Sequence, residues 1–352
     1  MTSKTNNIPN IDVTPCMKDM QAEWDAFVSG NNEASVFHRF GWKLVFEQVY
    51  GNECIYLAAK ENDAFVGILP LVFKKSFLFG KFLASLPYFD HAGICSKREE
   101  VREKLLMHAR GIAEKRGAEY IELRHDRERE SGLSTKQSKV SMILELPSDP
   151  DLLWSDLKAK VRNQVRKAEK EGLSIIDGGI ELVDDFYEIY AANMRDLGSP
   201  GHCKKFFGKI CDIFPEEVRI FTAKYRNKSV ASGFTIASKD TLTIPWASSL
   251  REFNSKCPNM LLYWSILKYA CESGFSLFSF GRSTPDEGTF RFKKQWGAKL
   301  NPLYWQYHLV NGHKLPDLSM DNAKYRLPVK IWKNTPVLIT KRLGPKLIKS
   351  LT

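Results

Sequence analysis

The segment GRSTPDEGTFRFKKQWG, residues 281–297, places basic side chains among aromatic ones. Its Gly-Arg-Ser turn follows the apolar run LFSF, a pattern typical of a strand end, where α/β sheets present functional groups. At such a position Arg282 could form two parallel hydrogen bonds with a carboxylate or phosphate, with Ser283 beside it. An arginine that caps a loop carbonyl would give the same pattern, and this alternative stays open.

Lys293 and Lys294 lie in a segment whose pattern predicts a short helix ended by Gly297. At about 100° per residue, Phe292 and Trp296 share the buried face of that helix. Lys294 then points about 200° away from Phe292, into solvent, whereas Lys293 at about 100° flanks the apolar face. A partly buried ammonium there could meet an anionic ligand, so Lys293 is the catalytic candidate. Two solvated surface lysines are the alternative.

The composition favours a folded protein of two domains. Hydrophobic residues make up 43% of the 352 residues and aromatic residues 12%, which is ample material for packed cores. The formal net charge of +11 and the pI near 9.2 favour anionic partners such as phosphates, nucleic acid or acidic lipid headgroups.

Cysteine usage and hydropathy indicate a cytoplasmic protein. The seven cysteines are odd in number, scattered and without a C-x-x-C pair, which predicts neither a disulfide framework nor a metal site. The N-terminal MTSKTNNIPNIDV has no apolar signal region, and the longest apolar run, VGILPLVF, is far below the ~20 residues that span a bilayer.

An internal repeat organises the chain. The segment IYLAAKENDAFVGILPLVF, residues 55–73, is echoed by RIFTAKYRNKSVASGFTIA, residues 219–237, at an offset of 164 (223 − 59 for the Ala-Lys pairs). Each copy reads as strand, turn and strand. Downstream of each, a helical pattern ends at Gly117 or Gly274 and a strand follows. Two such units in the same order predict a duplicated α/β fold.

The segments outside the repeat complete the predicted organisation. Residues 149–172 combine an apolar helical stripe with a basic one that includes Arg162 and Arg166. From His313 onward the chain holds nine Lys or Arg and two Asp. We expect a first domain at 1–147, a second at 148–312 that begins with the basic helix, and a basic tail at 313–352.

Seven segments resemble, in order, the FemAB-type acyltransferases, whose two GNAT-like domains arose by duplication. They are HRFGWKLVFEQVYG, VGILPLV, LASLPYFDHAGIC, VRNQVRKAEKEGLSI, MRDLGSP, LLYWSILKYACESGFSLFSFGRS and FRFKKQWG. Within that family the chain is most similar to the branch found with bacterial exopolysaccharide and exosortase systems. The resemblance implies two GNAT-like α/β domains with mixed, mostly antiparallel sheets and flanking helices.

The resemblance also implies binding residues. The family's lysine after phenylalanine falls on Lys293, which implies contact with the acyl donor or an anionic acceptor. The family's second-domain helix falls on Arg162 and Arg166, which then face a phosphorylated substrate, and MRDLGSP adds Arg195 as a substrate-binding candidate. An ordinary solvated helix face is the alternative for the basic stripe. Many relatives carry Asp where this chain has Ser279, so no general base is assigned there.

The first copy holds a second cluster, in SLPYFDHAG. Its Tyr88, Asp90 and His91 could orient an amine or shuttle a proton, although a structural Asp–His hydrogen bond is an equal alternative. Serine-hydrolase and zincin chemistry have no motif, because neither G-x-S-x-G nor H-E-x-x-H occurs.

The expected reaction is transfer of an acyl or aminoacyl group to an amine of an anionic or lipid-linked cell-envelope or polysaccharide precursor. The amine attacks an ester or thioester directly, so few catalytic side chains are required. The donor is aminoacyl-tRNA or acyl-CoA and no bound cofactor is expected. REFNSKCPNM lacks a glycine-rich pyrophosphate loop, while the basic charge permits tRNA. The alternative is a non-catalytic, charge-driven binder of RNA or membrane on a GNAT-like scaffold.

The basic tail interleaves large apolar residues with lysines and arginines. Such a composition suits an amphipathic segment that lies on anionic lipid. Pro336, Gly344 and Pro345 are expected to break it into short pieces, and a tail packed across the first domain is the alternative.

Overall fold

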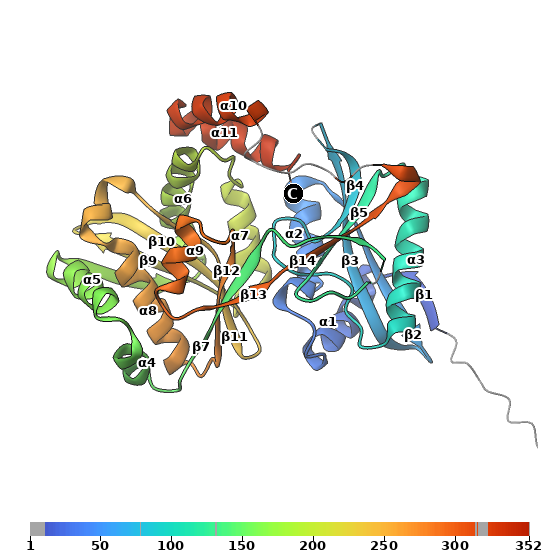
Figure 1. Cartoon of the computed structure of the whole chain (residues 1–352), viewed down its shortest axis with the longest axis horizontal. Helices are drawn as coiled ribbons and strands as arrows, with labels where there is room; N and C mark the ends of the chain where they lie inside the picture. Colours follow the sequence, from blue (N-terminus) through green and yellow to red (C-terminus); the bar gives the residue numbers. More distant parts are fainter. Residues whose placement is uncertain (1–10, 78, 131, 314, 316–322, 352) are drawn as a thin grey trace, which may run out of the picture. The chain divides into compact units, whose positions relative to one another are not determined.

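The computed structural model describes residues 11–77, 79–130, 132–313, 315 and 323–351, which fall into two compact units (Figure 1). The first unit contains the described residues of 1–136 and 304–315, and the second those of 137–303 and 316–352. Each unit is built on a seven-stranded sheet in which all neighbouring strands are antiparallel except one parallel pair. The predicted fold class, mixed and mostly antiparallel sheets with flanking helices, is confirmed.

The sheet of the first unit has helices on both faces. Its strands in spatial order are β1 (Ile11–Pro15), β2 (Glu53–Glu61), β3 (Ala64–Ser76), β4 (Gly80–Ser85), β5 (Tyr120–His125), β14 (Tyr304–Leu309) and β6 (Ser134–Lys136). Leu57 and Ala59 of β2 pack in the core that includes helix α3 (Glu99–Arg116). Tyr56, the residue before Leu57, points to the other face and stacks on Trp24 of α1 (Gln21–Gly30), where α2 (Gly41–Tyr50) also packs. The period-two alternation of this strand thus assigns its two faces.

The sheet of the second unit repeats this plan. Its strands in spatial order are β13 (Lys299–Pro302), β7 (Val140–Glu145), β12 (Leu277–Ser283), β11 (Thr241–Ser249), β10 (Lys228–Ser238), β9 (Val218–Tyr225) and β8 (Leu173–Gly178). One face packs on α8 (Pro258–Glu272), with α4 (Pro150–Asp156) and α5 (Ala159–Lys170) against that helix. The other face packs on α6 (Val183–Leu197) and α7 (Lys204–Ile213) through rings such as Phe186, Phe207 and Phe234.

The strand register supports the duplication inferred from the repeat. Ala59 pairs with Gly67 in the first unit and Ala223 with Ala231 in the second, which keeps the offset of 164 (223 − 59) in both strands. Each crossover helix is followed by a left-handed glycine, Gly117 after α3 (φ 61°) and Gly274 after α8 (φ 79°). These glycines hold the conformation that was expected where each helix ends.

The unit boundaries differ from the predicted domains, because two strands are exchanged. β7 lies within the predicted first domain, 1–147, but pairs with β12 and β13 in the second sheet. β14 lies within the predicted second domain, 148–312, but pairs with β5 and β6 in the first sheet. Val140, Met142 and Leu144 alternate into the second core. Alternation tells which face of a strand is buried, but it does not tell in which sheet the strand lies.

The basic tail forms two helices, α10 (Ala323–Asn334) and α11 (Val337–Ile348), which pack on α6 of the second unit (Figure 1). The tail helices therefore belong to the second unit, whereas the alternative drawn from the sequence placed the tail on the first domain. Pro336 separates the two helices as its N-cap position allows, but α11 continues through Gly344 and Pro345, where a break was expected.

Candidate functional site

The parallel strands of the second unit separate after a short pairing. Thr241–Thr243 of β11 pair with residues 277–279 of β12, after which β11 pairs only with β10 and β12 only with β7 among the described strands. A β-bulge in β11 marks the separation, and it contains Pro245, which has no main-chain N–H to contribute to a ladder. The facing edges therefore present main-chain groups at the carboxyl ends of parallel strands, where α/β proteins bind ligands.

Lys293 forms hydrogen bonds with the main chain at the end of β12. It lies in α9 (Gly288–Lys294) with 9% of its surface exposed, and its Nζ donates to the carbonyl oxygens of Gly281 at 3.1 Å and Arg282 at 2.8 Å. Adjacent carbonyls of a regular strand point in opposite directions. Gly281 has a left-handed φ of 68° within a bulge, which lets both carbonyls meet one ammonium. Lys294 is exposed, so the predicted difference between the two lysines is confirmed.

Two buried polar atoms near this strand end have no hydrogen-bond partner among the described residues. They are the hydroxyl of Ser283, whose residue is 4% exposed, and the indole Nε1 of Trp296, whose residue is 1% exposed. Buried donors are nearly always satisfied, so each calls for a ligand or a water molecule. Lys139 adds a cation, because its Nζ donates to the hydroxyl of Thr284 at 2.5 Å. The strand end thus combines unsatisfied donors with the positive charges of Arg282, Lys293 and Lys139.

The start of α8 lies beyond β11, where a pyrophosphate loop was sought in the sequence. Residues Arg251–Lys256 form a 3-10 helix, and Cys257, with a left-handed φ of 58°, leads into Pro258. Asn259 in the first turn of α8 donates from Nδ2 to the hydroxyl of Ser249 at 2.9 Å, which ties the helix to the end of β11. This segment is a helical turn without glycine and not a main-chain cradle.

The two arginines of the basic helix have local contacts. Nη1 of Arg162 donates to the carbonyl oxygens of Leu157 at 2.6 Å and Ser155 at 2.8 Å, so this guanidinium caps the end of α4. Arg166 is exposed and lies 5.5 Å from the ring centroid of Trp154. These contacts agree with the alternative of an ordinary solvated helix face, and substrate binding by either residue stays a prediction.

Tyr88, Asp90 and His91 belong to the first unit and follow β4. Tyr88 is strained at φ 75°, and its hydroxyl accepts a hydrogen bond from Lys74 Nζ at 2.7 Å. The main-chain oxygen of Asp90 accepts from Trp305 Nε1 at 3.3 Å. His91 packs edge-on against Phe37, and its Nδ1 is buried with no hydrogen-bond partner among the described residues. Their roles in catalysis or substrate binding stay predictions.

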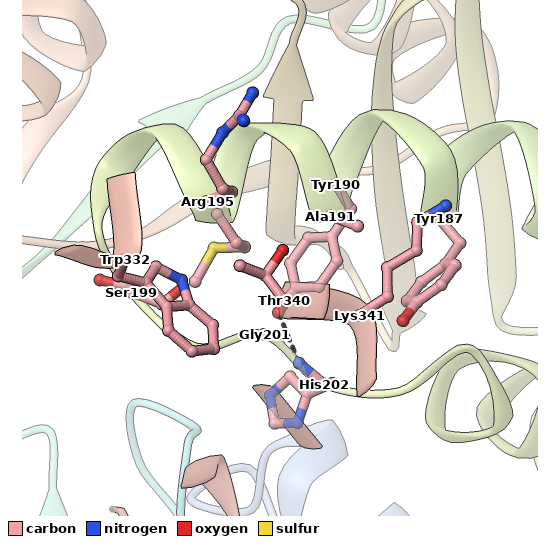
Figure 2. Close-up of a pocket in the computed structure, with 11 residues that line it drawn as sticks. Tyr187, Tyr190, Ala191, Arg195, Ser199, Gly201, His202, Trp332, Thr340 and Lys341 are labelled. Carbon is pink, nitrogen blue, oxygen red and sulfur yellow. Dashed lines mark hydrogen bonds between the residues drawn. The ribbon is translucent and has the colours of Figure 1, made fainter. Parts of the chain in front are cut away.

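Arg195 lies apart from the strand end, in a pocket between α6 and the C-terminal helices (Figure 2). Its Nε donates to Asp196 at 2.6 Å, and its Nη1 donates to the carbonyl oxygen of Thr335 at 3.4 Å. In this pocket Tyr190 accepts a hydrogen bond from the main-chain N–H of His202. The structure therefore does not bring Arg195 together with Lys293, Arg282 and Ser283.

Sequence reasoning missed a buried ion pair in the first unit. Glu122 and Arg124 of β5 are both fully buried, and Arg124 Nε donates to Glu122 at 2.7 Å. Tyr307 donates to the other carboxylate oxygen at 3.0 Å, and Arg124 also contacts the carbonyl of Phe89 and the ring of Trp305. Two charges at alternate positions in the otherwise apolar YIELRH could have signalled this pair.

Comparisons with known proteins relate the chain to GNAT-like proteins. Residues 155–294 match the family model described as an acetyltransferase (GNAT) domain. The crystal structure of FemX is 17% identical in sequence, with a TM-score of 0.65 over 85% of this chain and 98% of that one. The structure of L-PGS from Bacillus licheniformis is 12% identical, with a TM-score of 0.58 over 95% and 98% of the two chains.

A third solved structure, a tandem GNAT protein from the clavulanic acid biosynthesis pathway, is 12% identical, with a TM-score of 0.53 over 85% of this chain and 97% of that one. No curated protein sequence matches the chain. At these identities the solved structures establish the fold, which is a double GNAT-like fold of the kind found in FemX. Across the described residues no helix is long and apolar enough to cross a membrane, and no three metal-ligating side chains gather.

Proposed function

We propose that this protein transfers an acyl or aminoacyl group to an amine, at the carboxyl end of β12. The observation that carries the proposal is the separation of β11 from β12, which lies within the segment that matches the GNAT domain and beside the unsatisfied Ser283 hydroxyl. Arg282, Lys293 and Lys139 give this strand end a positive charge, which suits an anionic donor or acceptor.

The chemistry requires little from side chains. A neutral amine attacks the carbonyl carbon of an ester or thioester, the C–N bond forms, and the alcohol or thiol leaves with the electrons of the broken bond while the amine loses a proton. The protein then has to hold the two reactants and stabilise the developing oxyanion. We assign the oxyanion to main-chain N–H groups at the open edge of β11, and we assign to Lys293 the role of fixing the turn at residues 281–283.

The donor is an acyl-CoA or an aminoacyl-tRNA, and the acceptor we propose is an anionic or lipid-linked amine of an envelope or exopolysaccharide precursor. The GNAT match favours acyl-CoA. The tandem GNAT neighbour was solved "without AcCoA", and another neighbour is the C-terminal domain of a putative lysylphosphatidylglycerol synthetase, so both donor classes enter the test. Both donors are cytoplasmic, and the seven free cysteines suit a reducing compartment.

The test supplies purified protein with each labelled donor and a panel of envelope amines, and follows the transfer by mass spectrometry. Lys293→Met should lower the rate by about one to two decades, because two carbonyls lose a charge-assisted partner worth about 1.5–3 kcal/mol. Lys294→Met is the matched control and should leave the rate unchanged. Equal losses in the two variants, or no transfer from either donor by the unmodified protein, would refute the proposal.

A non-catalytic binder of RNA is the second candidate, favoured by the net charge of +11. It predicts RNA binding that weakens steeply with salt and no turnover of any acyl donor. The two functions therefore give opposite results in the donor assay.

A further inference from the structure

The outward surface of the two C-terminal helices exposes large aliphatic side chains. Six leucines and isoleucines within 21 residues are between 45% and 76% exposed: Leu327 and Ile331 on α10, and Leu338, Ile339, Leu343 and Leu347 on α11. We call these six residues, with the exposed basic residues around them, the outer face. Scattered single leucines are normal on a protein surface, but a concentration of this kind marks an interaction site.

The inner side of the same helices is already packed on the second unit. Trp332 Nε1 donates to the carbonyl oxygen of Ser199 at 3.0 Å, and Lys341 pairs with Glu188 on α6. Gly344 lies so close to Gly201 that a Cβ atom there would be 3.1 Å from the main-chain nitrogen. Figure 2 shows Trp332, Thr340 and Lys341 turned toward α6. The docking of α10 and α11 therefore does not use the outer face.

The outer face carries only positive charge. Residues 323–352 contain eight Lys or Arg and no Asp or Glu. Lys341 is held by Glu188, and the stem of Lys333 lies against Gly198 at the end of α6. Five other basic residues are exposed and pair with no carboxylate of the described residues: Arg326, Lys330, Arg342, Lys346 and Lys349. Arg342 and Lys346 on α11, and Lys349 directly after it, lie at helical spacing among the exposed leucines. A partner of this surface must be both apolar and anionic.

We propose that the outer face binds the surface of an anionic lipid bilayer, with α10 and α11 lying in the plane of the headgroups. Aliphatic side chains enter the acyl boundary while lysines and arginines meet lipid phosphates. A nucleic acid is disfavoured, because single-stranded sites stack bases on aromatic rings and the exposed apolar side chains here are all aliphatic. The inference is independent of the transfer reaction, since none of these residues belongs to the strand end of β12.

The test is co-sedimentation of the full-length protein with vesicles of phosphatidylcholine alone or with one third phosphatidylglycerol. The unmodified protein should pellet with the anionic vesicles and be released as salt rises. Arg342→Gln/Lys346→Gln/Lys349→Gln should weaken binding about a hundredfold, since each basic residue near an anionic surface contributes about fivefold. Leu338→Gln/Leu343→Gln/Leu347→Gln should weaken binding by at least about tenfold. All six side chains are exposed, so both variants should keep the thermal stability of the unmodified protein.

Matched controls change the same residue types elsewhere. Leu152→Gln/Ile180→Gln replaces aliphatic side chains that are 56% and 55% exposed, and Lys18→Gln/Lys97→Gln/Lys115→Gln removes three exposed lysines. Both controls should bind vesicles as the unmodified protein does. Losses equal to those of the outer-face variants would overturn the proposal, as would displacement of the protein from vesicles by stoichiometric single-stranded RNA.

Hydrogen–deuterium exchange of the unmodified protein gives a second readout that does not depend on any substitution. Anionic vesicles should slow exchange in residues 326–348 and leave the β3–β4 turn unchanged. In that turn Phe77, whose surface is 98% exposed, lies between Lys75 and Lys81. The turn is therefore the other candidate for contact with a membrane. Protection at the turn without protection of α10 and α11 would overturn the proposal.

Discussion

The two units share one strand arrangement but differ in the residues that occupy the end of the strand after the crossover helix. In each unit two parallel strands pair over three residues, β4 with β5 in the first unit and β11 with β12 in the second. The third paired residue of the later strand is Glu122 in β5 and Ser279 in β12. Two positions further along stand Arg124 and Gly281. The first unit thus fills its strand end with a buried ion pair, whereas the second places small residues there and brings Lys293 from a helix.

This difference is the reason for proposing the site in the second unit. Glu122 and Arg124 form a buried ion pair, and Tyr307 and the Phe89 carbonyl add hydrogen bonds to it, so protein groups fill the first strand end. Nη2 of Arg124 lies 2.6 Å from Glu122 but makes no well-formed hydrogen bond among the described residues. At the second strand end the Ser283 hydroxyl has no partner among the described residues. In a duplicated backbone the side chains thus decide whether a strand end is filled or open, which is why we propose a ligand site in the second unit alone. Four predictions test this comparison.

The largest expected effect is acid destabilisation of the first unit. Burial, helped in the case of His38 by nearby His91, lowers the pKa of His38 and of His125 to about 3. The unfolded chain binds these protons near pH 6.5, so stability is full above pH 6.5 and falls as the pH drops toward 3. Each histidine contributes up to about 1.4 kcal/mol per pH unit below pH 6.5, so the two together cost about 3 kcal/mol between pH 6.5 and 5 and about 6 kcal/mol between pH 6.5 and 4. Urea unfolding at these pH values measures it.

The control for this effect is His125→Gln, which should reduce the pH slope because one titrating group is gone. An unchanged slope would show that other groups cause the acid sensitivity.

The second prediction gives the strand end of the first unit the serine that the second unit has at the equivalent position. Glu122→Ser leaves the buried guanidinium of Arg124 without its carboxylate, and we expect a loss of about 3–5 kcal/mol in the free energy of unfolding. The double variant Glu122→Leu/Arg124→Met should be more stable than the single variant, because no unpaired charge remains. Chemical denaturation measures both, and a single variant as stable as the original would show that the ion pair does not close this strand end.

Arg282→Lys tests the open strand end with an intermediate effect. If the guanidinium forms two parallel hydrogen bonds with an anionic ligand, a lysine loses one of them, and kcat/KM should fall about tenfold with little change in melting temperature. Steady-state kinetics with the active donor measure this loss. Kinetics equal to those of the unmodified protein would leave Arg282 with the structural role of an arginine that caps a loop.

Ser283→Ala should have the smallest effect. Its hydroxyl has no protein partner among the described residues, so removal should leave the free energy of unfolding within about 0.5 kcal/mol. If a substrate satisfies that hydroxyl, KM should rise about fivefold, which corresponds to one hydrogen bond of about 1 kcal/mol. Ser279→Ala is the matched control, since its hydroxyl accepts from the main-chain N–H of Gly281 and should affect stability instead. A KM that does not change would remove Ser283 from the site.

The sequence alone determined the duplication and the burial of Lys293 beside an exposed Lys294. A repeat preserves hydrophobic alternation and the glycines that end helices, and both are local properties of the chain, so the offset of 164 appeared in the strand register unchanged (223 − 59). Lys293 and Lys294 were distinguished by helical geometry alone, because one turn of helix fixes which of two neighbours faces the core.

Tertiary structure alone decided those features of the fold that depend on contacts between segments distant in the sequence. The exchange of β7 and β14 could not be predicted, because a strand's pattern specifies a buried face and not its neighbours. The same holds for Arg162, whose partners are carbonyls at the end of α4 and directly after it, and for the tail, in which Gly344 lies against the main chain of Gly201. The pairing of Glu122 with Arg124 also belongs here, because a charge is stable inside a core only when folding brings its partner to it.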